Sequence, residues 1–98
     1  MATVIRYGSS HTRYNANSAG RLVSGKPGTL GALIINNVGV GATINFYDNA
    51  AGDTSGDPIA TWVTADGIAT KIMGCPMHNG ISMVQAGGTP ADVTVVWE

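Results

Sequence analysis

The sequence predicts an all-β protein: a small antiparallel β-sandwich or jelly-roll-like barrel of about eight short strands, with an extended N-terminal arm. β-Branched residues dominate, with nine Val, eight Ile and ten Thr against three Leu, and such side chains fit a pleated, half-buried sheet. Fourteen Gly and four Pro interrupt the chain at short intervals, and no stretch shows the 3.6-residue apolar period of a helix. Short strands at this spacing are typical of sandwiches and small barrels.

The expected strands follow the chain in order. They are Thr3–Tyr7, Arg21–Ser24, Leu30–Asn36, Ala42–Tyr47, Ile59–Val63, Ile68–Met73, Ile81–Ala86 and Asp92–Trp97. Because successive strand residues point to opposite faces, Ile44 and Phe46 are expected to share the core face of their strand. The strand Leu30–Asn36 is apolar on both faces, as expected of a central strand or of one covered by a neighbouring subunit. Asn79-Gly80 predicts a tight hairpin turn.

The chain is expected to divide at residue 20. Residues 21–98 form a single β-sandwich domain, and residues 1–20 form an N-terminal arm, or an edge strand plus a polar loop. Within this segment Gly8–Gly20 is polar and lacks strand periodicity. Charge is also divided, because residues 1–26 carry +4 and the remainder −5.

Composition excludes several classes of function. A net charge of −1 gives no basic footprint for nucleic acid. The longest apolar run in a strand, Ala32–Ile35, is far shorter than the roughly 20 residues of a membrane span. The first residues lack the pattern of a secretory signal, and a single cysteine forms no internal disulfide. We therefore expect synthesis in the cytoplasm and no contact with membranes.

Three motifs carry residue types that could support chemistry. Gly20–Lys26 matches the first seven positions of a phosphate-binding loop, but Pro27 stands where a Ser or Thr is required. Cys75 and His78 are three residues apart, yet the chain lacks the further Cys and His residues of a zinc site. The loop Asp48–Asp57 concentrates oxygen ligands without the spacing of a calcium loop, so a solvated turn-rich loop is expected. The sequence thus predicts no enzyme, no cofactor and no metal.

Three stretches carry a resemblance: Leu22–Asn37, Gly41–Asn49 and Asn79–Trp97. Their pattern is a strand ending in Asn, a short Gly/Ala turn, a strand ending in Tyr-Asp, and a final Gly-Gly-Thr hairpin. Over roughly residues 20–98 the chain resembles small all-β virion proteins of tailed bacteriophages. The resemblance implies a capsid decoration (cement) protein made in the bacterial cytoplasm. Such proteins lie on the capsid exterior and are usually oligomeric. For this chain we expect a homotrimer that bridges subunits of the major capsid protein.

Partner contacts are expected from basic and aromatic residues, chiefly near the N-terminus. The candidates are Arg6, Tyr7, His11, Arg13, Tyr14, Arg21 and Tyr47. Two alternatives remain open. The first is a neck, tail or fibre-base component of the virion. The second is a carbohydrate-binding β-sandwich module that uses the Asp48–Asp57 loop and exposed Tyr residues, whereas Trp97 shares a face with Val93 and Val95 and is expected in the core.

Overall fold

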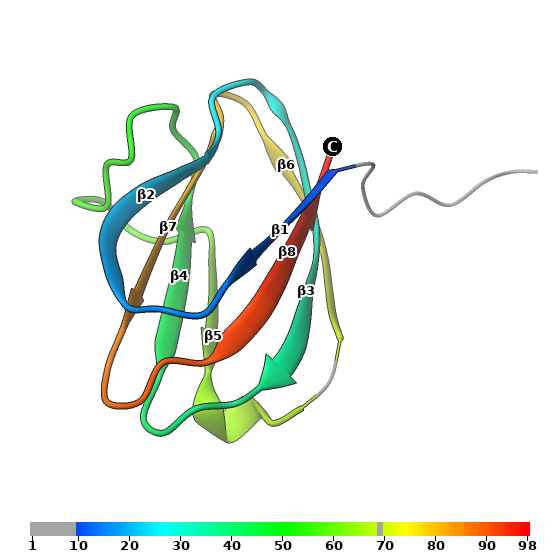
Figure 1. Cartoon of the computed structure of the whole chain (residues 1–98). Coiled ribbons are helices and arrows are strands. Elements are labelled where there is room, and N and C mark those ends of the chain that lie inside the picture. The colour runs from blue at the N-terminus through cyan, green and yellow to red at the C-terminus, as the bar shows by residue number, and fades with distance from the viewer. Residues whose placement is uncertain (1–9, 69) are drawn as a thin grey trace, which may run out of the picture.

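The computed structural model of the chain describes residues 10–68 and 70–98. Within them it contains eight strands and one short 3-10 helix (Figure 1). In chain order these are β1 (Ser10–Tyr14), β2 (Ser18–Ser24), β3 (Gly28–Asn37), β4 (Thr43–Tyr47), β5 (Ala60–Val63), η1 (Thr64–Asp66), β6 (Lys71–Met77), β7 (Ile81–Ala86) and β8 (Asp92–Trp97). The predicted all-β class is confirmed. No helix in this part of the chain is long and apolar enough to cross a membrane.

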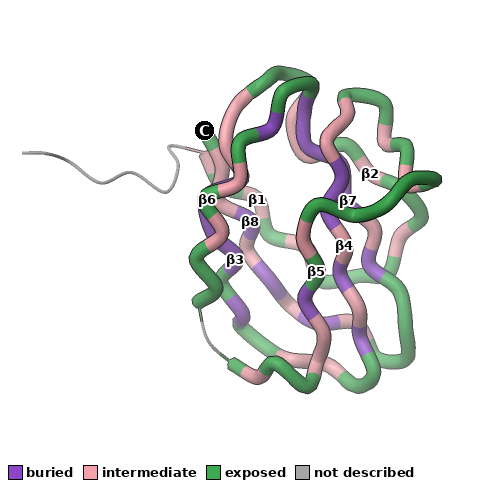
Figure 2. The backbone as a smooth tube through the Cα atoms, turned by 180° about the vertical axis from the view of Figure 1, so that it is seen from behind, coloured by how far each residue is buried: buried purple, intermediate pink, exposed green. Residues whose placement is uncertain are grey.

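The strands form two antiparallel sheets that pack face to face (Figures 1 and 2). One sheet has the order β1-β8-β3-β6 and the other β2-β7-β4-β5. Among the described strands, only β4 and β5 are neighbours both in sequence and in a sheet, so every other connection crosses between the sheets. This strand order is that of an eight-stranded jelly roll, which decides between the two architectures that the sequence left open.

The core fills the space between the sheets and follows the predicted alternation. Ile44 and Phe46 on β4 are both completely buried, as expected, and buried segments alternate with exposed ones along the strands (Figure 2). The largest fully buried apolar side chains are Trp62, Phe46, Leu30, Leu33, Ile44, Met77, Ile81, Met83, Val93 and Val95. Burying an aliphatic or aromatic side chain of this size contributes about 1.5–3 kcal/mol, so this cluster dominates the stability of the domain.

The strand β3 is central, which is one of the two explanations that its apolar sequence allowed. It pairs with β8 on one side and β6 on the other. An irregularity between Leu30 and Ala32 shifts the alternation by one residue, so that Leu30, Leu33 and Ile35 all face the core. Ile34 consequently faces outward and is 37% exposed.

The polar N-terminal segment differs from expectation. Ser10–Tyr14 is the strand β1, paired along its length with β8, and β2 begins at Ser18. Residues 10–20 therefore contribute to both sheets instead of forming an arm or a loop. The apolar period is absent because the inward positions Ser10, Thr12 and Tyr14 are only half-buried. The expected strand Thr3–Tyr7, and the arm as far as residue 9, lie outside the described residues.

The strand expected at Ile68–Met73 begins later, because η1 and Gly67 (φ +82°) precede it. The observed strand, β6, extends to Met77 through Gly74 and Pro76. Both residues weaken a central strand, but β6 lies at the edge of its sheet, where a missing N–H is tolerated.

The predicted hairpin at Asn79-Gly80 is wrong. The strands that this turn joins, β6 and β7, belong to different sheets, so the turn carries the chain across the sandwich. The Asp48 carboxylate accepts the backbone N–H groups of His78 at 3.0 Å and Asn79 at 2.8 Å. Gly80 is required here, because a Cβ would lie 2.8 Å from the Asn49 carbonyl oxygen.

Candidate partner-contact surface

The outer face of the β1-β8-β3-β6 sheet carries two of the expected contact residues, His11 and Arg13. Pairing of β1 with β8 places His11 opposite Val96 and Arg13 opposite Thr94. Pairing of β8 with β3 then places Ile34 opposite Thr94. Side chains that are far apart in sequence thereby form rows across one surface, because directly paired residues of neighbouring strands point to the same face.

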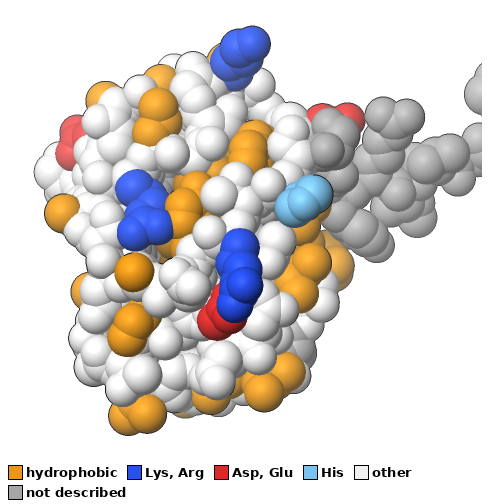
Figure 3. Space-filling model, in the orientation of Figure 1, with side chains coloured by type: hydrophobic (Ala, Val, Ile, Leu, Met, Phe, Trp, Pro, Cys, Tyr) orange, Lys and Arg blue, Asp and Glu red, His pale blue; other side chains and the backbone are white. Residues whose placement is uncertain are grey.

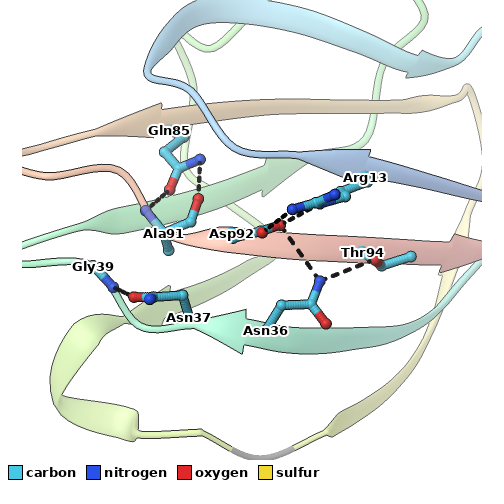
Figure 4. Close-up of polar contacts among 8 residues, drawn as sticks. All are labelled: Arg13, Asn36, Asn37, Gly39, Gln85, Ala91, Asp92 and Thr94. Carbon is cyan, nitrogen blue, oxygen red and sulfur yellow. Dashed lines mark hydrogen bonds and ion pairs between the residues drawn. The ribbon is translucent and has the colours of Figure 1, made fainter.

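Arg13 does not extend freely from this face. Its guanidinium forms two bonds with the Asp92 carboxylate, one of them from Nε to Oδ1 at 2.7 Å (Figure 4). Asn36 Nδ2 donates to the same Oδ1 and to Thr94 Oγ1, each at 3.4 Å. The bond from Arg13 lowers the pKa of Asp92, and the same pair raises the pKa of Arg13. This network leaves the surface polar but locally neutral.

Beside the network the face is apolar. Ile34 on β3 is 37% exposed, and Ile72 on β6 is 53% exposed. Ile72 pairs with Ala32, which lies two residues from Ile34 on the outward side of β3, so the two isoleucines are diagonal neighbours. Figure 3 shows one side of the molecule, on which charged side chains are few and apolar ones are scattered among uncoloured surface.

The remaining predicted contact residues fall into three groups. Arg6 and Tyr7 lie outside the described residues. Arg21 and Tyr14 contact each other, because the Arg21 guanidinium carbon lies 4.7 Å from the centre of the Tyr14 ring. Burial raises the pKa of Tyr14. Tyr47 is only 7% exposed, so most of its side chain is covered and it is not the exposed contact that was expected.

The Asp48–Asp57 loop is a folded unit held by its own polar groups. Asn49 Oδ1 accepts the backbone N–H groups of Ala51 and Asp53, both at 3.1 Å, and the Ser82 hydroxyl on β7 at 2.9 Å. The Ser82 Oγ in turn accepts the Gly52 N–H at 3.0 Å. Within residues 10–68 and 70–98, no group of three or more His, Cys, Asp or Glu residues could hold a metal ion.

The other motifs are placed as structural elements. Arg21–Ser24 lies within the strand β2, as predicted, so the phosphate-loop match is accidental. Cys75 is half-buried in β6 and packs against the core. Of the two tryptophans, Trp62 is 1% exposed, and Trp97 is partly buried and packs against the core.

Sequence reasoning missed Asp92 and the outward isoleucines Ile34 and Ile72. For Asp92 the signal was absent, because its partner Arg13 is 79 positions away in sequence. For Ile34 the alternation of β3 could have indicated the outward face. The continuous apolar run Ala32–Ile35 made inward and outward positions look alike. Comparison with protein families, with characterised proteins and with solved structures gives no match.

Proposed function

We propose that this protein is a structural virion protein that decorates and stabilises a phage capsid by bridging adjacent subunits of the major capsid protein. The observation that carries the proposal is the outer face of the β1-β8-β3-β6 sheet. On this face the Arg13 guanidinium is paired with the Asp92 carboxylate. Ile34 and Ile72 lie exposed beside this pair. Such a face can be covered by another protein without leaving an unpaired charge in the interface, and an unpaired charge would cost several kcal/mol.

Two further features support this function. Eight-stranded jelly rolls are frequent among viral capsid proteins, although they also occur in lectins and in enzymes, so the fold alone is an analogy. Only 11% of the residues are charged, which is well below the roughly 25% of ordinary soluble domains. A weakly charged surface suits broad contact with a shell, and repetition over many copies strengthens contacts that are weak individually.

The first test is the number of copies per particle, measured by quantitative mass spectrometry on gradient-banded virions of the source phage. We expect a number comparable with that of the major capsid protein. A handful of copies would overturn the shell role in favour of the neck, tail or fibre base. Absence from the particle would overturn a virion function altogether.

A second test addresses the face itself. Ile72→Glu introduces an unpaired carboxylate where the shell is expected to sit, so it should sharply reduce binding to particles that lack the protein. Val40→Glu is the matched control, because Val40 is 66% exposed in the connection between β3 and β4. Equal occupancy of particles by both variants and the unmodified protein would contradict docking through this face.

The proposal includes assembly as a homotrimer. Analytical ultracentrifugation of the purified protein, with and without capsids, measures the oligomeric state. We expect a species of three chains. The trimer would be contradicted if the protein is a monomer both when purified alone and when released from particles.

A further inference from the structure

An open pocket of about 340 Å³ lies between the end of β4 and the loop that joins β4 to β5. This loop is the green segment at the upper left of Figure 1. Tyr47 and Ile59 contribute to the wall, together with the carboxyl residues Asp48, Asp53 and Asp57. Hydrogen bonds to β7 and within the loop give the pocket a fixed shape. The volume is in the range of pockets that hold small ligands or single side chains.

The Tyr47 hydroxyl is the first sign that this pocket binds something. The side chain is more than nine-tenths buried, yet its hydroxyl forms no hydrogen bond within the described residues. Every fully buried side-chain nitrogen or oxygen in this part of the chain has a partner. The hydroxyl must therefore reach an opening, and the pocket is the opening that Tyr47 lines. A polar group held there is positioned to bond with a ligand.

Charge is the second sign. Backbone N–H groups of Asn79 and His78 lower the pKa of Asp48, and bonds from Ser55 lower the pKa of Asp53, so both carboxyls are ionised at neutral pH. Asp57 is exposed and has no hydrogen bond or ion pair with another described residue. No Lys or Arg lines the pocket among the described residues. The site thus presents carboxylates without a cation to balance them.

We propose that this pocket binds the cationic end of an arginine or lysine side chain on a partner chain. Ile59, 53% exposed, offers an apolar wall for the methylene stem of such a side chain. The Tyr47 hydroxyl accepts an N–H from the guanidinium or ammonium, and Asp57 supplies the opposite charge. A sugar is disfavoured, since the ring of Tyr47 is buried and leaves no face for stacking. This inference does not depend on the proposed virion function.

The test is a ¹H–¹⁵N NMR titration of the full chain with Nα-acetyl-arginine methylamide. Nα-acetyl-citrulline methylamide is the matched probe, because it has nearly the same shape without the charge. We expect saturable shifts of the Gly56, Asp57 and Ile59 amides with the arginine probe only. No shift with either probe, or equal shifts with both, would overturn the proposal.

Variants locate the binding. Asp57→Asn should raise the Kd of the arginine probe about two- to fivefold, the effect of one partly exposed ion pair. Tyr47→Phe should raise it about two- to tenfold by removing one hydrogen bond, and the fold should remain intact because this hydroxyl has no partner among the described residues. Asp66→Asn removes one carboxylate outside this pocket and should bind the probe normally. Unchanged affinity in both pocket variants would refute the site.

The cation has two possible sources, a second copy of this chain or a different protein. Residues 1–26 carry +4, so a second copy can supply it. Raising the protein concentration without any probe distinguishes the two sources. If the pocket amide resonances move toward their arginine-bound positions as the protein concentration rises, the cation comes from a second copy. If they do not move, although the arginine probe binds, the cation comes from another protein.

Discussion

The side-chain amide of Gln85 pairs with the backbone of Ala91 as a neighbouring strand would. Its Oε1 accepts the Ala91 N–H at 2.9 Å, and its Nε2 donates to the Ala91 carbonyl at 3.4 Å (Figure 4). Nε2 also donates to the Ala16 carbonyl at 3.3 Å. Gln85 is 1% exposed, so one buried amide joins the β7–β8 connection to the β1–β2 connection.

Gln85→Leu keeps the volume of the side chain and removes these bonds. The Ala91 N–H then remains unpaired in the interior, so the free energy of unfolding should fall by about 1–3 kcal/mol in urea titrations. Gln85→Glu keeps an acceptor for Ala91 but places a carboxylate against two carbonyls, so it should be more destabilising at pH 7 than at pH 4. A change below about 0.5 kcal/mol in Gln85→Leu would show that the amide is dispensable.

Asp48 should make stability depend on pH. Its folded pKa lies below the ordinary value of 3.8, because the N–H groups of Asn79 and His78 favour the carboxylate. The contribution of the Asp48 carboxylate to the stability of the fold is therefore complete above the pKa of Asp48 in the unfolded chain. It is lost as the pH falls through the pKa of Asp48 in the folded protein. Asp48→Asn should lower the Tm at pH 7, and the difference from the unmodified protein should shrink below about pH 4.

Asp57→Asn is the control for that experiment, since Asp57 has no partner among the described residues. At pH 7 its Tm should match that of the unmodified protein, because the substitution removes no hydrogen bond. A loss in Asp48→Asn that stays constant down to about pH 2 would contradict the role of the ionised carboxylate.

The loop between β4 and β5 needs a glycine beneath it. A Cβ on Gly20 would lie 1.9 Å from the Gly52 carbonyl oxygen, so Gly20→Ala must displace the loop and should cost about 1–3 kcal/mol. A Cβ on Gly56, in the same loop, would have nothing within 4 Å, so Gly56→Ala should be neutral or slightly stabilising. Chemical denaturation of the two variants measures the contrast, and equal stabilities would contradict it.

Removal of residues 1–14 tests the place of β1 in the sandwich. An arm or loop could be deleted without unfolding the domain, whereas β1 covers one edge of β8 and brings Tyr14 against the core. We expect the truncated chain to lose more than about 2 kcal/mol of stability, because a row of ladder hydrogen bonds disappears. An unchanged denaturation midpoint would show that β1 adds nothing to the fold.

The elements that the sequence predicted best are those with one face buried and one exposed. The strands Ile81–Ala86 and Asp92–Trp97 have the predicted bounds, because apolar alternation marks both of them clearly. The strand β1 gave no such signal, since an edge strand with half-buried inward residues can consist of Ser, Thr and Tyr. The turn at Asn79-Gly80 led to a wrong hairpin prediction, because local turn chemistry does not specify which sheet the next strand joins.

The candidate surfaces were harder to predict for the same reason. The sequence marked Arg13 as a contact residue, but only the fold brings Asp92 beside it. It also marked Tyr47 as a contact residue, but in the fold Tyr47 is only 7% exposed and lines a pocket beside the loop that follows β4. Both outcomes depend on segments that meet through long-range pairing, which local patterns do not encode.

The pairing of β1 with β8 also governs how the protein can form on the ribosome. Residues 10–14 emerge before their partners at 93–97, which are synthesised more than 75 positions later. β8 also separates β1 from β3, so this sheet has no continuous order until β8 arrives. Chains dominated by such distant pairings fold in milliseconds to seconds rather than microseconds. Until then β1 and β3 present unpaired edges, and a nascent chain halted before residue 92 would expose both to aggregation.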